Sequence, residues 1–240
     1  MNYSDIIPDF PRTRHLWYKP NAQRLDLIAS EEECRVVFEN DNTFVEEKVD
    51  GANCGISFYK GQPIIRNRNH FLQKGKTGHV ARTAAKMQFA SLFNWFYENL
   101  DKFEKLNELL GFEVSVYGEW LYALHGIKYD QLPSHFIAFD LYDWEKNKFI
   151  PTHQGRELLE LSGLNLVPLL HKGKVPSWEF LEKFCQEKGQ YSTTDKREGV
   201  YVKVASEDDI THRFKMVRTN FIQGCHWSNQ KITKNLLKNS

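Results

Sequence analysis

Apolar and polar residues alternate over several short stretches, the pattern expected of strands with one buried face. Two such stretches, 45–49 and 53–59, follow each other closely, and a turn signal at 60–63 precedes a third at 64–68. The same alternation predicts further strands over 112–120, 136–142, 199–204 and 212–217.

The spacing of apolar residues changes to three and four positions after Ala81, which predicts one long helix. Its buried face consists of Ala85, Phe89, Leu92, Phe96, Leu100 and Phe103. Shorter helices are predicted over 154–161 and 178–186, and helix-forming residues return at 230–237. Hairpins mixed with long returns favour an α+β fold over a regular βαβ alternation. We therefore expect a single domain over residues 1–240, with room for two sheets.

Composition supports a globular protein, because 41% of the 240 residues are hydrophobic and 26% are charged. Such a chain is neither disordered nor a low-complexity array. The 32 basic and 31 acidic residues leave a net charge of +1, so the chain has no global basic footprint for nucleic acid. A local basic patch stays compatible with that total.

The chain shows no export signal and no apolar run of the ~18 residues that a membrane span needs. We therefore expect an intracellular protein with no membrane partner, either cytoplasmic or virus-encoded and acting in the host cytoplasm. Four cysteines stand far apart with no Cys-x-x-Cys pair, which disfavours a zinc site and, in this setting, disulfides.

The first candidate site residue is Lys48, in the tetrapeptide Lys48-Val49-Asp50-Gly51 after a strand. An amine is a nucleophile only when it has lost its proton, which burial, nearby cations or a metal can promote. A surface lysine beside an Asp-Gly turn would have the same local sequence.

Two further candidates lie at predicted strands. Glu119 follows Gly118 and could bind a ribose hydroxyl or a metal-bound water, although an edge glutamate in solvent fits equally. Phe139 precedes Asp140 and could stack on a purine or simply fill the core.

The last two candidates are charged strands. Glu198 directly precedes the strand that carries Lys203, and Arg213 and Lys215 share one face of the next strand. Two neighbouring cations favour an anion between them, such as a polyphosphate, or form a basic edge that resists aggregation.

The order of these motifs distinguishes the readings. Lys-x-Asp-Gly, Gly-Glu, Phe-Asp, Glu-Gly-Val and a basic strand occur in the order typical of covalent nucleotidyltransferases, the polynucleotide ligases and RNA capping enzymes. Lys48 precedes Glu119, Glu198 and Lys215 by 71, 150 and 167 residues. Segments 11–16, 224–227 and 235–237 also resemble the two ends of an RNA ligase domain. From about residue 9 to 238, the chain resembles ATP-dependent RNA ligases of the branch that includes the second bacteriophage RNA ligase and the RNA-editing ligases.

The resemblance implies a nucleotidyltransferase domain, ATP-grasp-like, with antiparallel sheets flanked by helices. It also implies ATP as co-substrate, Mg²⁺ or Mn²⁺ as metal, and Lys48 as the residue that becomes lysyl-AMP. Glu119 and Glu198 would hold the metal through water. The residues implied in ATP binding are Glu47, Lys48, Val49, Arg68, Glu119, Phe139, Glu198, Lys203, Arg213 and Lys215.

The implied partners are RNA ends with a 5′-phosphate and a 3′-hydroxyl. Asn53 matches the family asparagine that engages the 5′-phosphate, and Arg68 an arginine on the nucleotide and RNA phosphate, with Arg66 as the alternative two positions away. A basic run with one interleaved aromatic residue, Phe71, is also suited to binding single-stranded RNA. The alternative is that this stretch is an ordinary mobile loop. This run consists of Arg66, Arg68, His70, Lys74 and Lys76.

Two departures from the family pattern matter. Arg213 stands where the family has a lysine, so we expect Lys215 to be the more critical of the pair. Only 25 residues follow Lys215, too few for the OB-fold domain of DNA ligases and capping enzymes. An accessory RNA-binding protein could supply the missing contacts. The alternatives are another nucleotidyltransferase, either a DNA nick ligase or a GTP-using capping enzyme, and a module that binds nucleotide or RNA ends without turnover.

Overall fold

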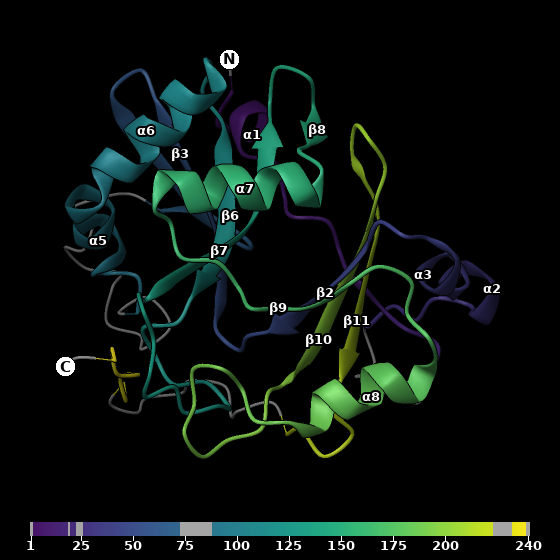
Figure 1. Ribbon diagram of the computed structural model, residues 1–240. Coiled ribbons are helices and arrows are strands. Elements are labelled where there is room, and N and C mark those ends of the chain that lie inside the picture. Colours follow the sequence, from purple (N-terminus) through teal and green to yellow (C-terminus); the bar gives the residue numbers. More distant parts are fainter. Residues whose placement is uncertain (1, 19, 23–25, 73–87, 223–231, 239–240) are drawn as a thin grey trace.

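Two mostly antiparallel sheets lie side by side and are flanked by helices (Figure 1). The structure is a computed structural model that describes all residues except 1, 19, 23–25, 73–87, 223–231 and 239–240. The expected α+β class with antiparallel sheets and flanking helices is confirmed, and both sheets of the described chain are open.

The first sheet, sheet A, contains the strands that carry the lysine motif and the basic motif. Its strand order is β1 (Arg14–His15), β11 (Ile210–Val217), β10 (Gly199–Ala205), β2 (Thr43–Lys48) and β9 (Leu169–Lys172). Only β1 and β11 run parallel. The apolar side of this sheet packs on three helices: α2 (Glu31–Cys34), α3 (Val36–Glu39) and α8 (Trp178–Gln186).

Sheet B is antiparallel throughout. Its strand order is β5 (Phe71–Leu72), β4 (Gln62–Asn67), β3 (Ala52–Tyr59), β6 (Ser115–Trp120), β7 (Phe136–Asp143) and β8 (Lys148–Phe149). One face packs on α5 (Leu92–Glu98), α6 (Leu100–Leu110) and α7 (Thr152–Ser162), while the short α1 (Tyr3–Ile6) packs at the other side of β6. Figure 1 shows α5, α6 and α7 gathered over this sheet.

Most strand predictions are confirmed to within three residues at each end, because alternation marks strands with one buried face. The helices at 154–161 and 178–186 are confirmed as α7 and α8. Several short elements were not predicted, namely α1, α2, α3, β1, β5, β8 and β9, although Ser30 and Glu33 form a capping box at the start of α2.

Two helix predictions are wrong within the described residues. The predicted long helix begins only at Leu92, after turns at 88–91, and its first part, 81–87, lies outside the described residues. It is then interrupted at Asn99, whose backbone leaves the helical region (φ −123°, ψ 19°) and whose side chain donates to the carbonyl of Trp95. Residues 232–238 form isolated bridges in place of the expected helix. Asn235 accounts for this, since its side chain bonds the backbone of Leu121, Ala123 and Tyr129 and draws the segment onto the domain.

No helix among the described residues combines the length and the apolar character that crossing a membrane requires.

Candidate active site

The chain leaves sheet A and enters sheet B within three residues, and Lys48 stands at that junction. β2 ends at Lys48 and β3 begins at Ala52, so Val49, Asp50 and Gly51 alone connect the sheets. Gly51 is required there by close approach: a Cβ atom would lie 2.6 Å from Leu121 Cδ2 and 2.7 Å from the Trp120 carbonyl oxygen. The Asp-Gly pair therefore makes a tight crossing between sheets rather than a hairpin turn.

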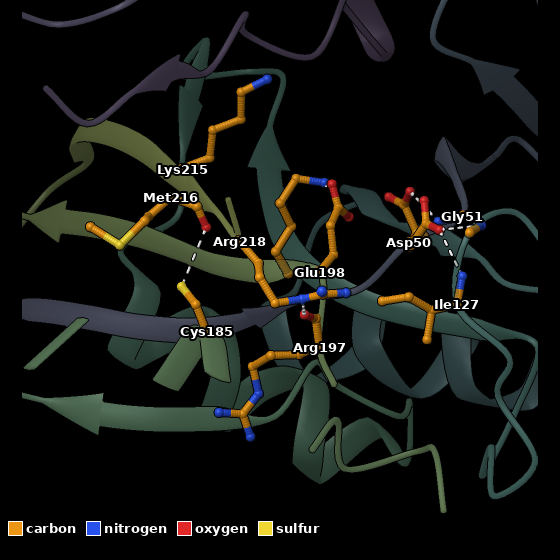
Figure 2. Close-up of polar contacts among 12 residues, drawn as sticks. Asp50, Gly51, Ile127, Cys185, Arg197, Glu198, Lys215, Met216 and Arg218 are labelled. Carbon is orange, nitrogen blue, oxygen red and sulfur yellow. Dashed lines mark hydrogen bonds and ion pairs between the residues drawn. The ribbon is translucent and has the colours of Figure 1, made fainter. Parts of the chain in front are cut away.

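Asp50 holds this crossing from the side. Its Oδ2 accepts hydrogen bonds from the amides of Gly126 and Ile127, at 2.6 and 3.1 Å (Figure 2). Its own amide donates to the buried hydroxyl of Tyr129 at 2.8 Å. A carboxylate that receives two backbone donors is well satisfied, so we assign Asp50 to fixing the lysine loop.

Lys48 lines a pocket of about 180 Å³ that lies between the two sheets. Many of the predicted site residues line this pocket: Glu47, Lys48, Val49, Asn53, Arg68, Glu119, Phe139 and Lys215. They come from both sheets, so the pocket exists only when the sheets are packed together. Sequence reasoning did not assign other lining residues, among them Phe10, Thr13, Asp26, Glu46, Val167 and Tyr201.

Lys48 is ion-paired with Glu198. Its Nζ lies 2.7 Å from Glu198 Oε2, and the side chains are 24% and 8% exposed. Burial alone would lower the pKa of Lys48, but the carboxylates of Glu198 and Glu119 outweigh burial and raise the pKa above its ordinary value. In the nucleotide-free protein the amine is therefore protonated at neutral pH.

The two glutamates have raised pKa values. Burial raises the pKa of Glu119 to about 8, with Lys48 opposing the shift and Glu198 adding to it. Burial likewise raises the pKa of Glu198 to about 7, again opposed by Lys48. Glu119 also accepts a hydrogen bond from the Gly51 amide at 3.2 Å, which ties it to the lysine loop. The site thus contains two carboxyl groups whose ionisation is unfavourable in the folded protein, because burial disfavours the charged form.

This pair fits a divalent cation bound together with substrate. Among the residues that the structure describes, no group of three or more His, Cys, Asp or Glu side chains could hold a metal ion alone. Mg²⁺ in nucleotide enzymes usually takes one or two carboxylates and completes its shell with phosphates and water. Glu119 and Glu198 supply that number, and a cation would offset the cost of ionising them.

Lys215 lines the pocket from β11, the strand paired with β10, and Glu198 directly precedes β10. Its Nζ lies 3.0 Å from Asp26 Oδ1, and Asp26 Oδ2 lies 3.3 Å from His15 Nε2. Burial and the neighbouring Lys215 lower the pKa of His15. A cation on the pocket wall thus carries a carboxylate as its partner in the nucleotide-free protein.

The two candidate arginines occupy different environments. Arg68 is exposed and lines the pocket. Arg66 is buried, where its Nη1 donates to the Ile7 carbonyl at 3.0 Å and its guanidinium pairs with Asp9. Of the two arginines, Arg68 is the one that a molecule bound in the pocket could contact. Lys74 and Lys76, the last two residues of the basic run, lie outside the described residues.

Glu47 turns its side chain away from that of Lys48. Its carboxylate accepts from the Gln190 amide at 2.9 Å and lies 3.6 Å from Arg197 Nε. Burial raises its pKa against these contacts. Its backbone and that of Val49 remain beside the pocket.

Four predicted site residues are not among those that line the pocket, namely Arg66, Glu198, Lys203 and Arg213. Lys203 Nζ lies 2.7 Å from Glu46 Oε2 and 2.6 Å from Asp140 Oδ1, in the interior between the sheets. Arg213 also pairs with Asp140, at 3.4 Å, and its guanidinium stands 4.1 Å from the centre of the Phe149 ring. Both cations thus serve contacts between the sheets.

Signals for the unassigned residues were weak. Phe10 and Thr13 flank or belong to the N-terminal segment that resembles the family, but nothing local marks them as lining a pocket. Tyr201 lies on β10, the strand that Glu198 precedes, and its hydroxyl lies 2.7 Å from that of Thr13. Alternation along that strand was the available signal for Tyr201, because it places residues 201 and 203 on one face.

A comparison of the sequence with protein-family models identifies the family of this chain. The RNA ligase model matches residues 41–217, which include Lys48, Glu119, Glu198 and Lys215. The match covers well over half of the chain, so the chain belongs to the RNA ligase family. No curated protein matches the chain at sequence level.

Solved structures share the fold. The chain is similar to the Naegleria gruberi RNA ligase with pyrophosphate, at 18% identity and a TM-score of 0.57. A variant of that ligase solved with ATP and Mn gives the same values, and another with AMP and Mn gives 16% and 0.56. Each alignment covers 89% of this chain but only 56–58% of the Naegleria chain. The chain thus spans less than two thirds of those proteins.

Proposed function

We propose that the protein is an ATP-dependent RNA ligase that joins a 3′-hydroxyl end to a 5′-phosphate end through lysyl-AMP. One observation carries the proposal: Lys48, Glu119 and Lys215 line one pocket and Glu198 Oε2 lies 2.7 Å from Lys48 Nζ, although up to 167 residues separate these side chains in the sequence. An amine with two carboxyl groups and a second cation is suited to nucleotidyl transfer, which depends on positioning and charge compensation.

In the first step, Lys48 Nζ attacks the α-phosphorus of ATP. The N–P bond forms as the bond from that phosphorus to the bridging oxygen breaks, and pyrophosphate leaves with the electron pair. The ammonium must lose a proton beforehand, and Glu198 Oε2 is an acceptor at 2.7 Å. Lys215 compensates the charge of the phosphates.

The next two steps move AMP and then release it. An oxygen of the RNA 5′-phosphate attacks the lysyl-AMP phosphorus, which frees Lys48 and leaves a phosphoanhydride on the RNA. A 3′-hydroxyl oxygen then attacks the phosphorus of the former 5′-phosphate, and AMP leaves. Asn53 and Arg68, which line the pocket, are the residues we assign to the RNA end, with the buried Arg66 as the alternative to Arg68.

The remaining assignments follow the same geometry. The ring of Phe139 would stack on adenine, and the backbone groups of Glu47 and Val49 would contact its edge. Glu119 and Glu198 would hold Mg²⁺ or Mn²⁺, which supplies charge neutralisation on the phosphates when bound. An accessory RNA-binding protein would act beyond this chain's own pocket.

Covalent labelling tests the proposal. Protein is first treated with pyrophosphate to remove bound AMP, then incubated with Mg²⁺ and ATP labelled on the α-phosphate, and separated under denaturing conditions. We expect a labelled band for the wild type, none for Lys48→Ala, and an unchanged band for Lys105→Ala, which removes an exposed lysine of α6. A nicked duplex with RNA or DNA at the 3′-hydroxyl then identifies the substrate.

The other outcomes point elsewhere. Labelling by GTP in place of ATP would indicate a capping reaction, and sealing of DNA ends as fast as RNA ends would indicate a DNA ligase. ATP binding without any labelled band from folded wild-type protein would contradict ligase activity and favour a binding module.

A further inference from the structure

Lys203 has an unusual environment for a lysine in a nucleotide enzyme. Its side chain is completely buried, and its ammonium has three partners from two different sheets. The carboxylate of Glu46 on β2 lies at 2.7 Å, that of Asp140 on β7 at 2.6 Å, and the Phe139 carbonyl oxygen at 2.8 Å. An ammonium has three N–H donors, so its hydrogen-bonding capacity is filled.

The two carboxylates around Lys203 are themselves anchored. Glu46 pairs with Arg156 of α7 at 2.7 Å, and Asp140 with Arg213 of β11 at 3.4 Å. Buried charges are tolerated when each has such a partner. Lys203 is therefore the centre of an ion network that joins sheet A to sheet B.

Phe139, the third partner, occupies a β-bulge. In the pairing of β6 with β7, Tyr117 lies opposite Asp140 while Gly118 lies opposite Ala138, which leaves Phe139 as the additional residue. A bulge leaves its extra residue outside the ladder and changes the direction of a side chain. The Phe139 carbonyl is thus available to Lys203.

The bulge explains how two adjacent residues serve the same side of the sheet. Successive side chains of a regular strand point to opposite faces. Here the Phe139 ring lines the nucleotide pocket, and the Asp140 carboxylate reaches across to sheet A. The ring also meets Phe10 edge-on at 5.3 Å, and Lys203 Nζ lies 5.7 Å from its centre.

We propose that Lys203 is a positioning residue: by bonding the Phe139 carbonyl and Asp140 from the opposite sheet, it holds the bulge that presents the Phe139 ring to the nucleotide base. Its effect on catalysis passes through Phe139 rather than through the phosphates. The part of this inference that concerns nucleotide rests on the proposed function, whereas the part that concerns the bulge does not.

The first test asks whether the bulge depends on Lys203. Amide hydrogen exchange is measured by mass spectrometry on nucleotide-free protein, for the wild type, Lys203→Met and Lys174→Met, an exposed lysine 3.7 Å from Asp41. We expect faster exchange over Phe136–Asp143 in Lys203→Met only. Unchanged exchange in a folded Lys203→Met protein would overturn the proposal, whatever the protein's activity.

The second test asks through which residue Lys203 acts. Lys203→Met should raise the ATP concentration for half-maximal labelling about tenfold, the scale of one lost base-stacking contact, with a smaller change in the saturating rate. In a Phe139→Ala background the same substitution should add little, because the ring is already absent. Equal effects in both backgrounds would indicate a direct phosphate contact and overturn the proposal.

Two further variants keep the test decisive. Lys203→Arg retains the charge and its donors and should restore part of the affinity and of the exchange protection. If Lys203→Met does not fold, Asp140→Asn removes one anchor at constant shape and should shift exchange and half-maximal ATP in the same direction. Absence of labelling in the wild type would refute the proposed function alone, because the exchange experiment still decides the role of Lys203.

Discussion

Replacing Glu119 with glutamine should stabilise the nucleotide-free protein, and the gain should increase with pH. Burial raises the pKa of Glu119 from 4.5 to about 8 in the folded protein. The unfolded chain therefore loses this proton at lower pH than the folded protein does. Stability falls as pH rises from about 4.5 to about 8, because the folded state binds more protons over that interval. Glutamine has no proton to lose, so its variant escapes this decline.

The size of the gain follows from the same values. A pKa difference of one corresponds to about 1.4 kcal/mol, so a pKa of about 8 against 4.5 gives an upper bound of about 5 kcal/mol. Partial exposure of the side chain and the nearby Lys48 reduce this, and we expect about 2 kcal/mol. For a chain of this size, that gain raises the melting temperature by about 4–8 °C.

Thermal unfolding of protein stripped with pyrophosphate measures the effect at several pH values between 5 and 9. We expect the two melting temperatures to be close at pH 5 and to separate above pH 7, with Glu119→Gln the higher. Glu108→Gln removes the same charge from an exposed position on α6 and serves as the control. A difference between wild type and Glu119→Gln that stays constant with pH would refute the reasoning, and so would a loss of stability at pH 9.

Three other predictions follow from the same contacts. The initial rate of lysyl-AMP formation at saturating ATP should rise with pH from 6 to 9, since the pKa of Lys48 is raised and only the free amine reacts; a flat profile would contradict this. Arg156→Ala should lower the free energy of unfolding, measured in urea, by about 3 kcal/mol, because it removes one of the two cations paired with buried Glu46. A loss below about 1 kcal/mol, the scale of an exposed pair, would show that Arg156 does not stabilise the buried carboxylate. Gly51→Ala should cost about 1–3 kcal/mol and impair labelling, because its Cβ would overlap Leu121 and Trp120; wild-type melting and labelling would refute this.

Local sequence patterns predicted strands well and helix ends poorly, for reasons visible in the contacts. The apolar period continues through Asn99 because α5 and α6 pack on the same sheet, so periodicity cannot detect the interruption between them. The bond from the Asn99 side chain to the Trp95 carbonyl decides the break. Near the C-terminus, the Asn235 side chain bonds the backbone of three residues more than 100 positions away, and these bonds take the place of the expected helix. No local sequence pattern reports such contacts.

Motif order anticipated much of the pocket wall, because each motif lies at a strand end or on a strand beside the sheet junction. It could not anticipate the contacts that cross between sheets. Asp26 opposite Lys215 lies in a segment with no motif, and the role of Lys203 depends on a bulge one sheet away. The sequence shows that Lys203 and Lys215 are cations, whereas only the fold shows which groups they bond.

The contrast between two lysines of sheet A shows how the same residue type serves two purposes. Lys203 is completely buried, and each of its two carboxylate partners has an arginine as well, so its charges are compensated without any ligand. Lys48 is 24% exposed, and its partner Glu198 and neighbour Glu119 have pKa values raised to about 7 and about 8. The protein's own side chains therefore compensate the charges around Lys48 incompletely, and a phosphate-bound cation would complete the compensation. The first arrangement holds the two sheets together, and the second leaves the site around Lys48 dependent on what it binds.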